Sequence, residues 1–403
     1  MHCTRKINNE IYWVGSNDRR LNLFENIFSI PDGVSYNSYL VCDEKTVLID
    51  TVDYSVSRQY IENILYILNG SPLDYLIINH MEPDHCAVIP ELCRMFPELK
   101  IIGNAKTFQM IKQFYGYESE SRAHVVKEGD ILTTGRHSFK FIFAPMVHWP
   151  EVMVSYDIKD KILFSADAFG SFGALSGNIF NDEIDFEKDW LDESRRYYSN
   201  IVGKYGASVQ NLLKKASELD INAICPLHGP VWRSNLGLIL DKYNKWSLYE
   251  PEENGVVIAY GSIYGHTQNA AECLAAKLAD SGVKNISMYD VSCTDISYII
   301  SDMFKYGHIV LMSPTYNAGV FRPVETLVND MKALNVQKRK VAVFENGSWA
   351  PAAAKQIIKV LEEMKDITLY DEKISIKSAL TSEQGNEIYN LAEKIASEIN
   401  QKG

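Results

Sequence analysis

Potential metal ligands gather in one short segment of this 403-residue chain. His80, Glu82, Asp84 and His85 lie within six residues and directly follow Tyr75–Ile78, an apolar run that predicts a strand. Side chains on a strand alternate between its faces, so these four cannot converge from a strand, whereas a loop can wrap them around two adjacent ions. The segment therefore predicts a binuclear metal site. A capped turn rich in carboxylates is the alternative.

Three more potential ligands also stand just after an apolar run. The pairs are Phe139–Phe143 with His148, Ile162–Phe164 with Asp167, and Ala223–Cys225 with His228. A single histidine in such a place is more often a structural residue than a ligand. Strand ends on one edge of a sheet, however, bring distant residues into one pocket, so the repeated coincidence favours a site. The other histidines lack this context and are not expected to bind metal: His2, His124, His137, His266 and His308.

These residues resemble the pattern of the metallo-β-lactamase fold, an αββα sandwich with a binuclear metal site at its sheet edges. Hydrolases of that fold carry the motif HxHxDH and usually bind zinc, whereas here Glu82 takes the place of the second histidine. A donor set richer in carboxylate favours iron over zinc. The spacing His85-x62-His148-x18-Asp167-x60-His228 is similar to that of flavodiiron proteins, and all seven ligand positions of that family are filled.

The resemblance implies a role for each residue. His80, Glu82 and His148 would hold one iron, Asp84, His85 and His228 the other, and Asp167 would bridge them. Tyr197 would be a hydroxyl donor beside the ligands, although tandem tyrosines on a helix more often only pack. Some family members have a histidine in an N-terminal loop where this chain has Leu23–Asn26, so no role that depends on that histidine is carried over.

A second candidate site follows the predicted strand Val256–Tyr260 and opens a predicted helix. Its hydroxyl groups and the free backbone N–H groups of a helix N-terminus can cradle an anion. No Gly-Lys-Ser/Thr follows, so a flavin monophosphate suits the loop better than a nucleoside triphosphate. The loop resembles the flavodoxin phosphate loop with Tyr264 in place of one hydroxyl residue, and an ordinary strand–helix turn is the alternative. Its residues are Ser262, Ile263, Tyr264, Gly265, His266 and Thr267.

Two more loops lie where a flavodoxin needs them. One follows the predicted strand Ile309–Met312 and the other follows the predicted strand Lys340–Phe344, at carboxyl ends where doubly wound sheets bind ligands. Gly347 allows close approach of the backbone, and Trp349 offers an aromatic face for a flavin ring. We therefore expect FMN. The candidate residues are Pro314, Thr315, Tyr316, Asn317, Asn346, Gly347, Ser348 and Trp349.

The elements that must position these residues fall into two domains, 1–250 and 251–403. The first has many short strands, including Ser35–Val41, and a helical stretch at Glu187–Leu219. A polar, turn-rich linker, Trp246–Gly255, precedes a regular alternation of strands and helices. The alternation predicts a C-terminal doubly wound flavodoxin-like sheet of five parallel strands. The resemblance implies an N-terminal αββα metallo-β-lactamase-like sandwich, so we expect an α/β protein.

The amino-acid composition excludes some classes of binding partner. The chain has 40 Lys+Arg against 52 Asp+Glu, a formal net charge of −12, so it offers no basic surface for nucleic acid or anionic membrane. Apolar runs are of strand length and no signal peptide is apparent, which predicts a cytoplasmic protein. Seven scattered cysteines without a CxxC motif argue against a disulfide framework, a zinc ribbon or a built-in rubredoxin.

A diiron site and FMN together imply an oxidoreductase that reduces O2 to water, NO to N2O, or both. Two ferrous ions and reduced FMN would hold the four electrons that O2 needs. The resemblance further implies a head-to-tail homodimer, possibly paired into a tetramer, and an external electron donor such as rubredoxin. The rival interpretations are a binuclear zinc hydrolase with a fused flavin domain, and a flavin electron carrier whose metal site is only structural.

Overall fold

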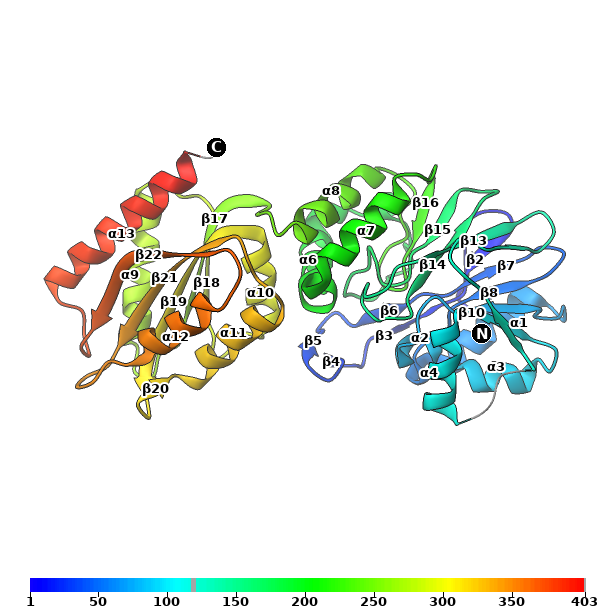
Figure 1. The fold of residues 1–403 in the computed structure, drawn as a ribbon, viewed down its shortest axis with the longest axis horizontal. Coiled ribbons are helices and arrows are strands. Elements are labelled where there is room, and N and C mark those ends of the chain that lie inside the picture. Colours follow the sequence, from blue (N-terminus) through cyan, green and yellow to red (C-terminus); the bar gives the residue numbers. More distant parts are fainter. Residues whose placement is uncertain (117–120, 402–403) are drawn as a thin grey trace. The chain divides into compact units, whose positions relative to one another are not determined.

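The computed structural model describes residues 1–116 and 121–401 (Figure 1). The chain forms two compact units. The first comprises Met1–Tyr198 and Ala207–Asn244, and the second comprises Ser199–Gly206 together with the chain from Lys245 onward. In the described part of the chain, every helix is too short or too polar to cross a membrane. The seven cysteines are all free thiols.

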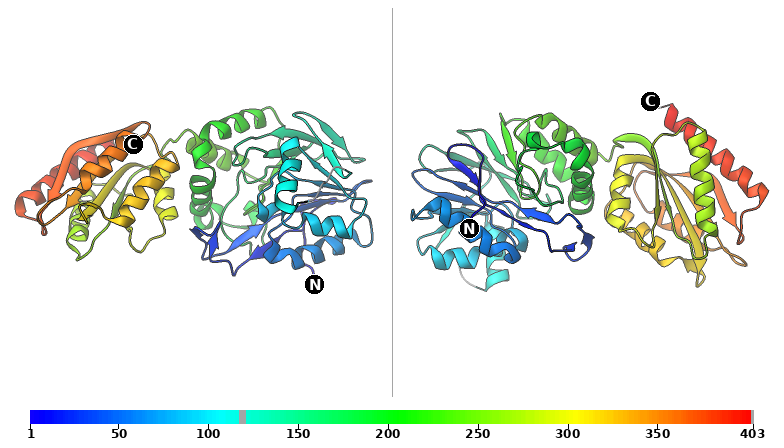
Figure 2. Two further views of the ribbon diagram at one scale, coloured as in Figure 1. Left: turned by 60° about the horizontal axis from the view of Figure 1, so that its bottom comes forward. Right: turned by 180° about the vertical axis from the view of Figure 1, so that it is seen from behind.

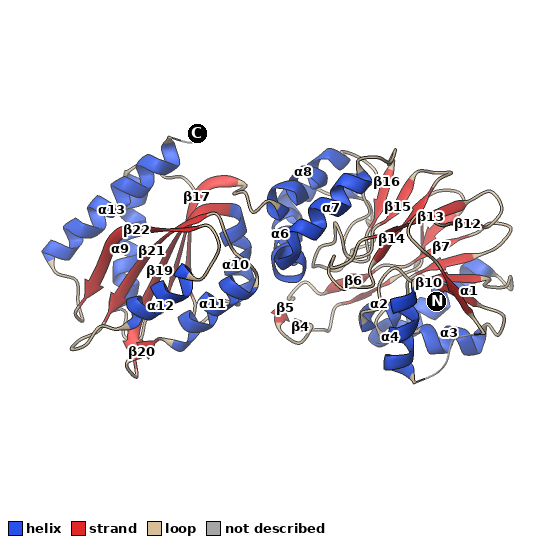
Figure 3. Ribbon diagram, viewed as in Figure 1, coloured by secondary structure: helices blue, strands red, loops and turns tan. Residues whose placement is uncertain are grey.

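Two sheets face each other in the first unit (Figure 3). The first sheet has the order β1 (Arg5–Lys6), β2 (Ile11–Trp13), β7 (Tyr39–Val41), β8 (Val47–Ile49), β9 (Tyr75–Ile77), β10 (Lys100–Gly103) and β11 (Ala123–Val125). The second has the order β12 (Ile131–Thr133), β13 (Ser138–Phe143), β14 (Met153–Asp157), β15 (Ile162–Phe164) and β16 (Ala223–Cys225). Two short ribbons pair β3 (Ser16–Asp18) with β6 (Val34–Tyr36), and β4 (Leu23–Phe24) with β5 (Phe28–Ser29).

The core of this unit lies between the two sheets. Ile49 and Ile77 from the first sheet belong to the same buried cluster as Phe139, Phe141 and Phe164 from the second. Helices α1, α3 and α4 lie beside the first sheet, and α7 and α8 beside the second, which makes the predicted αββα sandwich (Figures 1 and 2). The helices are η1 (Tyr54–Val56), α1 (Ser57–Leu68), α2 (Pro83–Cys86), α3 (Ile89–Met95), α4 (Ala105–Tyr115), η2 (Asn181–Glu183), α5 (Phe186–Asp189), α6 (Leu191–Tyr197), α7 (Gly206–Ala216) and α8 (Leu236–Ser247).

The second unit is a doubly wound sheet with the order β18-β17-β19-β21-β22, all parallel. Helices α9 and α13 pack together on one face, and α10, α11 and α12 cover the other (Figure 2). The elements are β17 (Glu253–Tyr260), α9 (His266–Asp280), β18 (Ile286–Asp290), α10 (Ile296–Lys305), β19 (Tyr306–Tyr316), β20 (Gly319–Val320), α11 (Arg322–Ala333), β21 (Arg339–Asn346), α12 (Ala353–Glu362), β22 (Ile367–Ile376) and α13 (Ser382–Asn400).

The structure corrects two expected elements in residues 35–219. The expected strand Ser35–Val41 is two strands, β6 and β7, because Asn37 leaves the ladder to donate its side-chain amide to the carbonyls of Pro226 and Gly229. The expected helical stretch Glu187–Leu219 is broken into α5, α6, a π-helical turn at Tyr198–Val202, a 3₁₀ turn at Gly203–Tyr205 and α7.

The expected linker and the expected sheet of the second unit also need correction. Half of the linker Trp246–Gly255 lies in regular elements: Trp246 is buried in α8 and Glu253 begins β17. The predicted five parallel strands are present, and one strand was missed. This strand, β20, pairs antiparallel with the end of β19.

Candidate metal centre

All seven predicted ligands meet at one edge of the sandwich. His80 and Glu82 follow β9 of the first sheet, and Asp84 and His85 lie on the short helix α2. The other three stand after strands of the second sheet: His148 after β13, Asp167 after β15 and His228 after β16. The side chains form two groups in which the potential ligand atoms lie within 4.8 Å of one another. The structure thus brings together the seven residues that follow predicted strands in the sequence.

The first group comprises His80, Glu82, His148 and Asp167. The Nε2 atom of His148 lies 2.9 Å from Oε2 of Glu82 and 3.1 Å from Oδ2 of Asp167. The Nε2 atom of His80 lies 3.2 Å from each of the same two oxygens. Atoms that bind one ion at about 2.1 Å are separated by about 3 Å when they subtend a right angle at the ion. The spacing therefore suits one metal ion.

The second group comprises Asp84, His85 and His228. The two Nε2 atoms each lie 3.3 Å from Oδ2 of Asp84. Asp167 also faces this group, but with its other oxygen: Oδ1 lies 3.2 Å from Nε2 of His85, whereas Oδ2 faces the first group. One carboxylate thus presents a separate oxygen to each group, which is the arrangement of a bridging ligand.

The charges of this pocket are strongly coupled. Burial opposes ionisation of each group, but attraction between His80 and Asp167 outweighs it, so the pKa of His80 is raised well above its usual range and that of Asp167 is lowered well below. Burial raises the pKa of Asp84 to about 7. For His148, hydrogen bonds to Asp167 and Glu82 overcome the opposing effect of burial and raise the pKa to about 9. Positive charge between the buried carboxylates therefore stabilises them.

Orphaned atoms test whether metal ions fit this pocket. Among the described residues, the four buried oxygens of Asp84 and Asp167 have no hydrogen-bond partner other than the imidazoles of the neighbouring ligands, which lie 3.1–3.7 Å away. When these imidazoles are neutral, such buried carboxylates are strongly unfavourable unless they bind a cation. A set of imidazoles and three carboxylates is suited to iron. The residues therefore fit a centre of two iron ions.

Aromatic rings cover the pocket. The Tyr197 ring lies 5.3 Å from that of His228, and its buried hydroxyl has no partner among the described residues, so it remains a candidate donor to a bound species. Phe24 meets His228 edge-on at 5.4 Å, and Tyr36 lies 5.7 Å from the same ring. Trp149 lies edge-on to His80 at 5.4 Å. These rings restrict the access of water to the ligands.

Sequence reasoning missed two acidic residues here. Glu151 hydrogen-bonds to Nδ1 of His80 at 2.8 Å, and its position three residues after His148 was the available signal. Glu25 lies on the β4–β5 hairpin, where desolvation and the neighbouring Glu82 carboxylate raise its pKa to about 8. Glu25 lies in Leu23–Asn26, the segment where some family members have a histidine. The fold brings this segment next to the ligand Glu82.

A third acidic cluster joins Glu10, His137 and Asp160 away from the predicted ligands. His137 hydrogen-bonds to Glu10 through Nε2 and to Asp157 through Nδ1, each at 3.0 Å. Lys159 also pairs with Glu10, so a protein cation already neutralises this cluster. Both ring nitrogens of His137 are therefore already paired with protein carboxylates.

The candidate flavin loops lie side by side at the carboxyl ends of the adjacent strands β17, β19 and β21. In the first loop the Ser262 hydroxyl accepts hydrogen bonds from the backbone N–H groups of Gly265 and Gln268, which shapes the N-terminus of α9. Gly265 has a φ of +87°, which favours glycine. Ile263, His266 and Thr267 complete this loop, and Thr267 is buried.

The other two loops are tied to each other. Pro314, Thr315 and Tyr316 end β19 rather than form a loop, because Thr315 and Tyr316 pair with β20. Asn317 lies in the tight turn that follows, with a φ of +48°. The Thr315 hydroxyl accepts the N–H of Ala352 in the third loop.

Two large aromatic side chains are exposed at this edge of the second unit's sheet. Trp349 is 92% exposed and Tyr264 is 90% exposed, although aromatic rings usually bury most of their surface. Asn346 exchanges hydrogen bonds with Ser378, and Ser348 accepts one from the same residue, which fixes the third loop around Gly347. A helix N-terminus and exposed aromatic side chains on neighbouring loops at one sheet edge fit a phosphorylated flavin.

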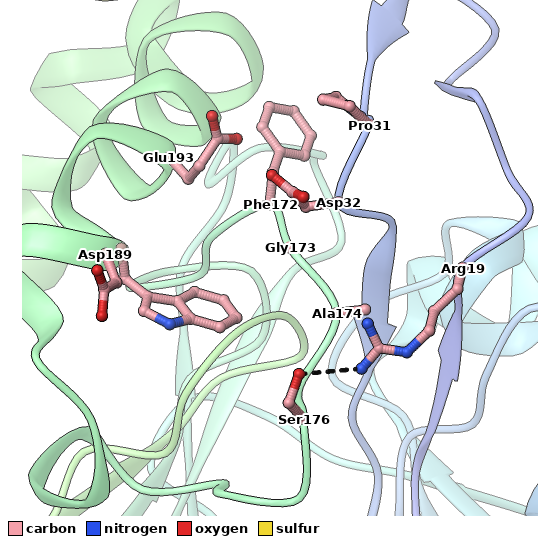
Figure 4. A pocket seen from close by; sticks show the side chains of 10 residues that line it. Arg19, Pro31, Asp32, Phe172, Gly173, Ala174, Ser176, Asp189 and Glu193 are labelled. Atoms are coloured by element: carbon pink, nitrogen blue, oxygen red, sulfur yellow. Dashed lines mark hydrogen bonds between the residues drawn. The ribbon is translucent and has the colours of Figure 1, made fainter.

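The first unit has a further pocket, which Figure 4 shows from close by. Its volume is about 330 Å³, and Arg19, Phe172, Trp190 and Glu193 are among the lining residues. Arg19 donates to the Leu175 carbonyl and the Ser176 hydroxyl, and Glu193 pairs with Arg196. Its long charged side chains are therefore already partnered, in contrast to the carboxylates of the metal centre.

Fold and sites together define a metalloprotein of the metallo-β-lactamase type joined to a flavodoxin-like domain. A family model described as ODP family beta lactamase matches residues 34–229, and a flavodoxin model matches residues 258–379. The anaerobic nitric oxide reductase flavorubredoxin of Escherichia coli O1:K1 / APEC is 30% identical over 362 residues, which cover 89% of this chain and 75% of that protein. The chain belongs to the flavodiiron protein family, whose cofactors are a diiron centre and FMN.

Two solved structures match the fold of this protein over nearly the whole chain. The flavodiiron protein of Giardia intestinalis matches with a TM-score of 0.94 at 27% identity, covering 99% of this chain and 97% of the other. Rubredoxin:oxygen oxidoreductase from Desulfovibrio gigas matches with a TM-score of 0.92 at 28% identity, covering 99% of each chain. The flavorubredoxin and the Desulfovibrio gigas protein are named as oxidoreductases, which argues against the interpretation as a zinc hydrolase.

Proposed function

We propose that this protein reduces O2 to water, NO to N2O, or both, at a diiron centre in its first unit. The observation that carries the proposal is the position of Asp167, whose two oxygens face two separate groups of ligands. Relatives with matching architecture are named for these two substrates: the flavorubredoxin for nitric oxide and the Desulfovibrio gigas protein for oxygen.

The proposed ligands follow the two groups. His80, Glu82 and His148 hold one iron, Asp84, His85 and His228 hold the other, and Asp167 bridges them. When bound, the two irons and FMN would supply the electrons and the redox chemistry. Three carboxylates offset most of the charge of two divalent ions, which suits a neutral diatomic substrate.

The protein's own residues prepare the pocket. Phe24, Tyr36 and Trp149 pack against the imidazole ligands and limit entry of water. The buried hydroxyl of Tyr197 has no hydrogen-bond partner among the described residues, and we assign it the role of hydrogen-bond donor to the bound substrate. Its pKa is raised well above the usual range by burial, so the hydroxyl keeps its proton at neutral pH.

The flavin assignment places the FMN phosphate at the N-terminus of α9. Ser262, Gly265 and Thr267 would surround the phosphate, and Trp349 and Tyr264 would stack on the ring. Rubredoxin or another external protein would deliver electrons, as the name of the Desulfovibrio gigas relative suggests. We further propose a head-to-tail homodimer, possibly paired into a tetramer, acting in the cytoplasm.

Metal and flavin content together with gas consumption test this proposal. Protein purified anaerobically from iron-replete cells is expected to hold about two irons and one FMN per chain, and to consume O2 or NO when NADH, rubredoxin and its reductase are supplied. His148→Ala and Asp167→Ala are expected to abolish gas consumption, while the exposed His124→Ala does not. Zinc that persists in place of iron, or full activity in Asp167→Ala, would refute the proposal.

A further inference from the structure

The ligand histidines differ in what holds the far side of their rings. Nδ1 of His80 lies 2.8 Å from Oε1 of Glu151, a carboxylate. Nδ1 of His228 lies 2.7 Å from the backbone carbonyl of Ser35, which is neutral. Nδ1 of His85 is buried and has no hydrogen-bond partner among the described residues. The two halves of the metal centre are therefore anchored unequally.

Glu151 is itself held firmly. Its Oε1 also accepts the backbone N–H of Met81 at 2.9 Å, directly beside His80 in the chain. The backbone carbonyl of Glu151 accepts the side-chain amide of Asn104, the residue that caps α4. The side chain is 1% exposed. Glu151 thus connects the loop of His80 to the loop of His148, two segments about seventy residues apart in the chain.

An imidazole binds metal through one nitrogen and is oriented through the other. A carboxylate that accepts the Nδ1–H fixes the tautomer with a free lone pair on Nε2 and makes that nitrogen a stronger donor. A neutral carbonyl fixes the tautomer but adds less electron density, and a ring without such a partner is oriented by packing alone. Loss of such an outer partner typically lowers metal affinity about 10- to 100-fold.

We propose that Glu151 is a positioning residue that orients His80 and makes the half of the centre formed by His80, Glu82 and His148 bind its ion more tightly than the other half. The inference rests on the proposed two-metal function. It concerns the order in which the halves fill: the half with His80 fills first on assembly and empties last under a chelator.

The test is a cobalt titration of the full-length protein after metal removal, in the presence of a competing chelator. Two backgrounds isolate the halves: His228→Ala leaves the half that contains His80, and His148→Ala leaves the half that contains His85 and His228. Glu151→Gln is then added to each, because glutamine keeps an acceptor for Met81 but removes the charge. Glu91→Gln, a partly exposed carboxylate on α3, is the matched control.

In the His228→Ala background, Glu151→Gln is expected to weaken cobalt binding about 10- to 100-fold and to shift the visible absorption of the bound ion. In the His148→Ala background, it is expected to change the affinity less than about threefold. Equal weakening in both backgrounds, or none in either, would overturn the proposal. Glu91→Gln is expected to change neither affinity.

A second measurement does not depend on whether the Glu151 variant folds. The His228→Ala protein is expected to bind its single ion more tightly than the His148→Ala protein, and the reverse order would overturn the proposal. Neither titration uses gas or flavin. A wild-type protein that binds two cobalt ions but reduces neither gas would therefore contradict the proposed function alone, whereas one that binds a single ion would contradict the two-metal centre itself.

Discussion

The Nε2 atoms of His85 and His228 lie 2.9 Å apart and point at the same position. The two rings are nevertheless held differently, because His228 is anchored by the Ser35 carbonyl, whereas the far nitrogen of His85 has no partner among the described residues. A ring without an acceptor at its far nitrogen is a weaker donor to the metal, so it contributes less to affinity.

Removal of these two rings should therefore have unequal effects. We expect His228→Ala to reduce bound iron to about one per chain, and His85→Ala to retain more than that after dialysis against the same chelator. Iron per chain, measured by atomic absorption, gives the comparison. Equal losses in the two variants would show that the Ser35 contact does not matter for metal retention.

Metal uptake should release protons. In the metal-free site burial would lower the pKa of His148, but hydrogen bonds to Asp167 and Glu82 outweigh this effect and raise the pKa to about 9. Below that pH the imidazole carries a proton that must leave before Nε2 can bind metal, so affinity should rise as pH increases from 6.5 to 9. Asp84, whose pKa burial raises to about 7, acts with the same sign.

Calorimetric titration with cobalt in two buffers of different ionisation enthalpy measures the protons released at each pH. His148→Ala should release fewer protons than the wild type, and His124→Ala the same number. An affinity that does not change between pH 6.5 and 9 would contradict this account of the pocket.

The two exposed aromatic residues of the second unit should contribute to flavin binding. Trp349 and Tyr264 expose about nine tenths of their surface, and stacking on a planar ring stabilises by about 0.5–1.5 kcal/mol beyond buried area. Trp349→Ala is expected to raise the Kd for FMN about 10-fold, and Tyr264→Ala somewhat less. Quenching of flavin fluorescence measures both.

Iron content should remain unchanged in the flavin variants, because the two sites lie in different units. Tyr389→Ala, a half-exposed tyrosine on α13, is the control and should leave the Kd for FMN unchanged. An unaltered Kd in Trp349→Ala would remove the stacking role assigned to that residue.

His137 should stabilise the first unit in a pH-dependent way. Burial alone would lower its pKa, but hydrogen bonds to Asp157 and Glu10 raise it above the usual value. A raised pKa in the folded state means that the stabilisation is complete below about pH 6.5, the unfolded value, and is lost as pH rises through the folded pKa.

His137→Gln is expected to lower the free energy of unfolding by about 1–3 kcal/mol at pH 6, with a smaller difference at pH 9. Urea unfolding followed by tryptophan fluorescence measures this, with the exposed His124→Gln as control. A difference that grows with pH would contradict the assigned sign.

Much of this architecture could be predicted from local patterns. The alternation of apolar runs and helices in the second unit predicts its five parallel strands, and the three flavin loops follow because parallel strands end at the same edge. Irregular segments could not be predicted in this way. Asn37 breaks a strand because its side chain binds Pro226 and Gly229, almost two hundred residues away, and no local pattern reports such a contact.

For the metal centre, the sequence by itself determined the kinds of ligand and their place at strand ends, including Glu82 where the hydrolases have histidine. The tertiary structure decided how these ligands divide. Asp167 faces both groups because β15 lies between β14, which follows the loop with His148, and β16, which precedes the loop with His228. Glu151 reaches His80 only through the packing of two sheets. Residue types and spacing follow from local sequence, whereas the direction of a side chain across an interface depends on how distant strands pack.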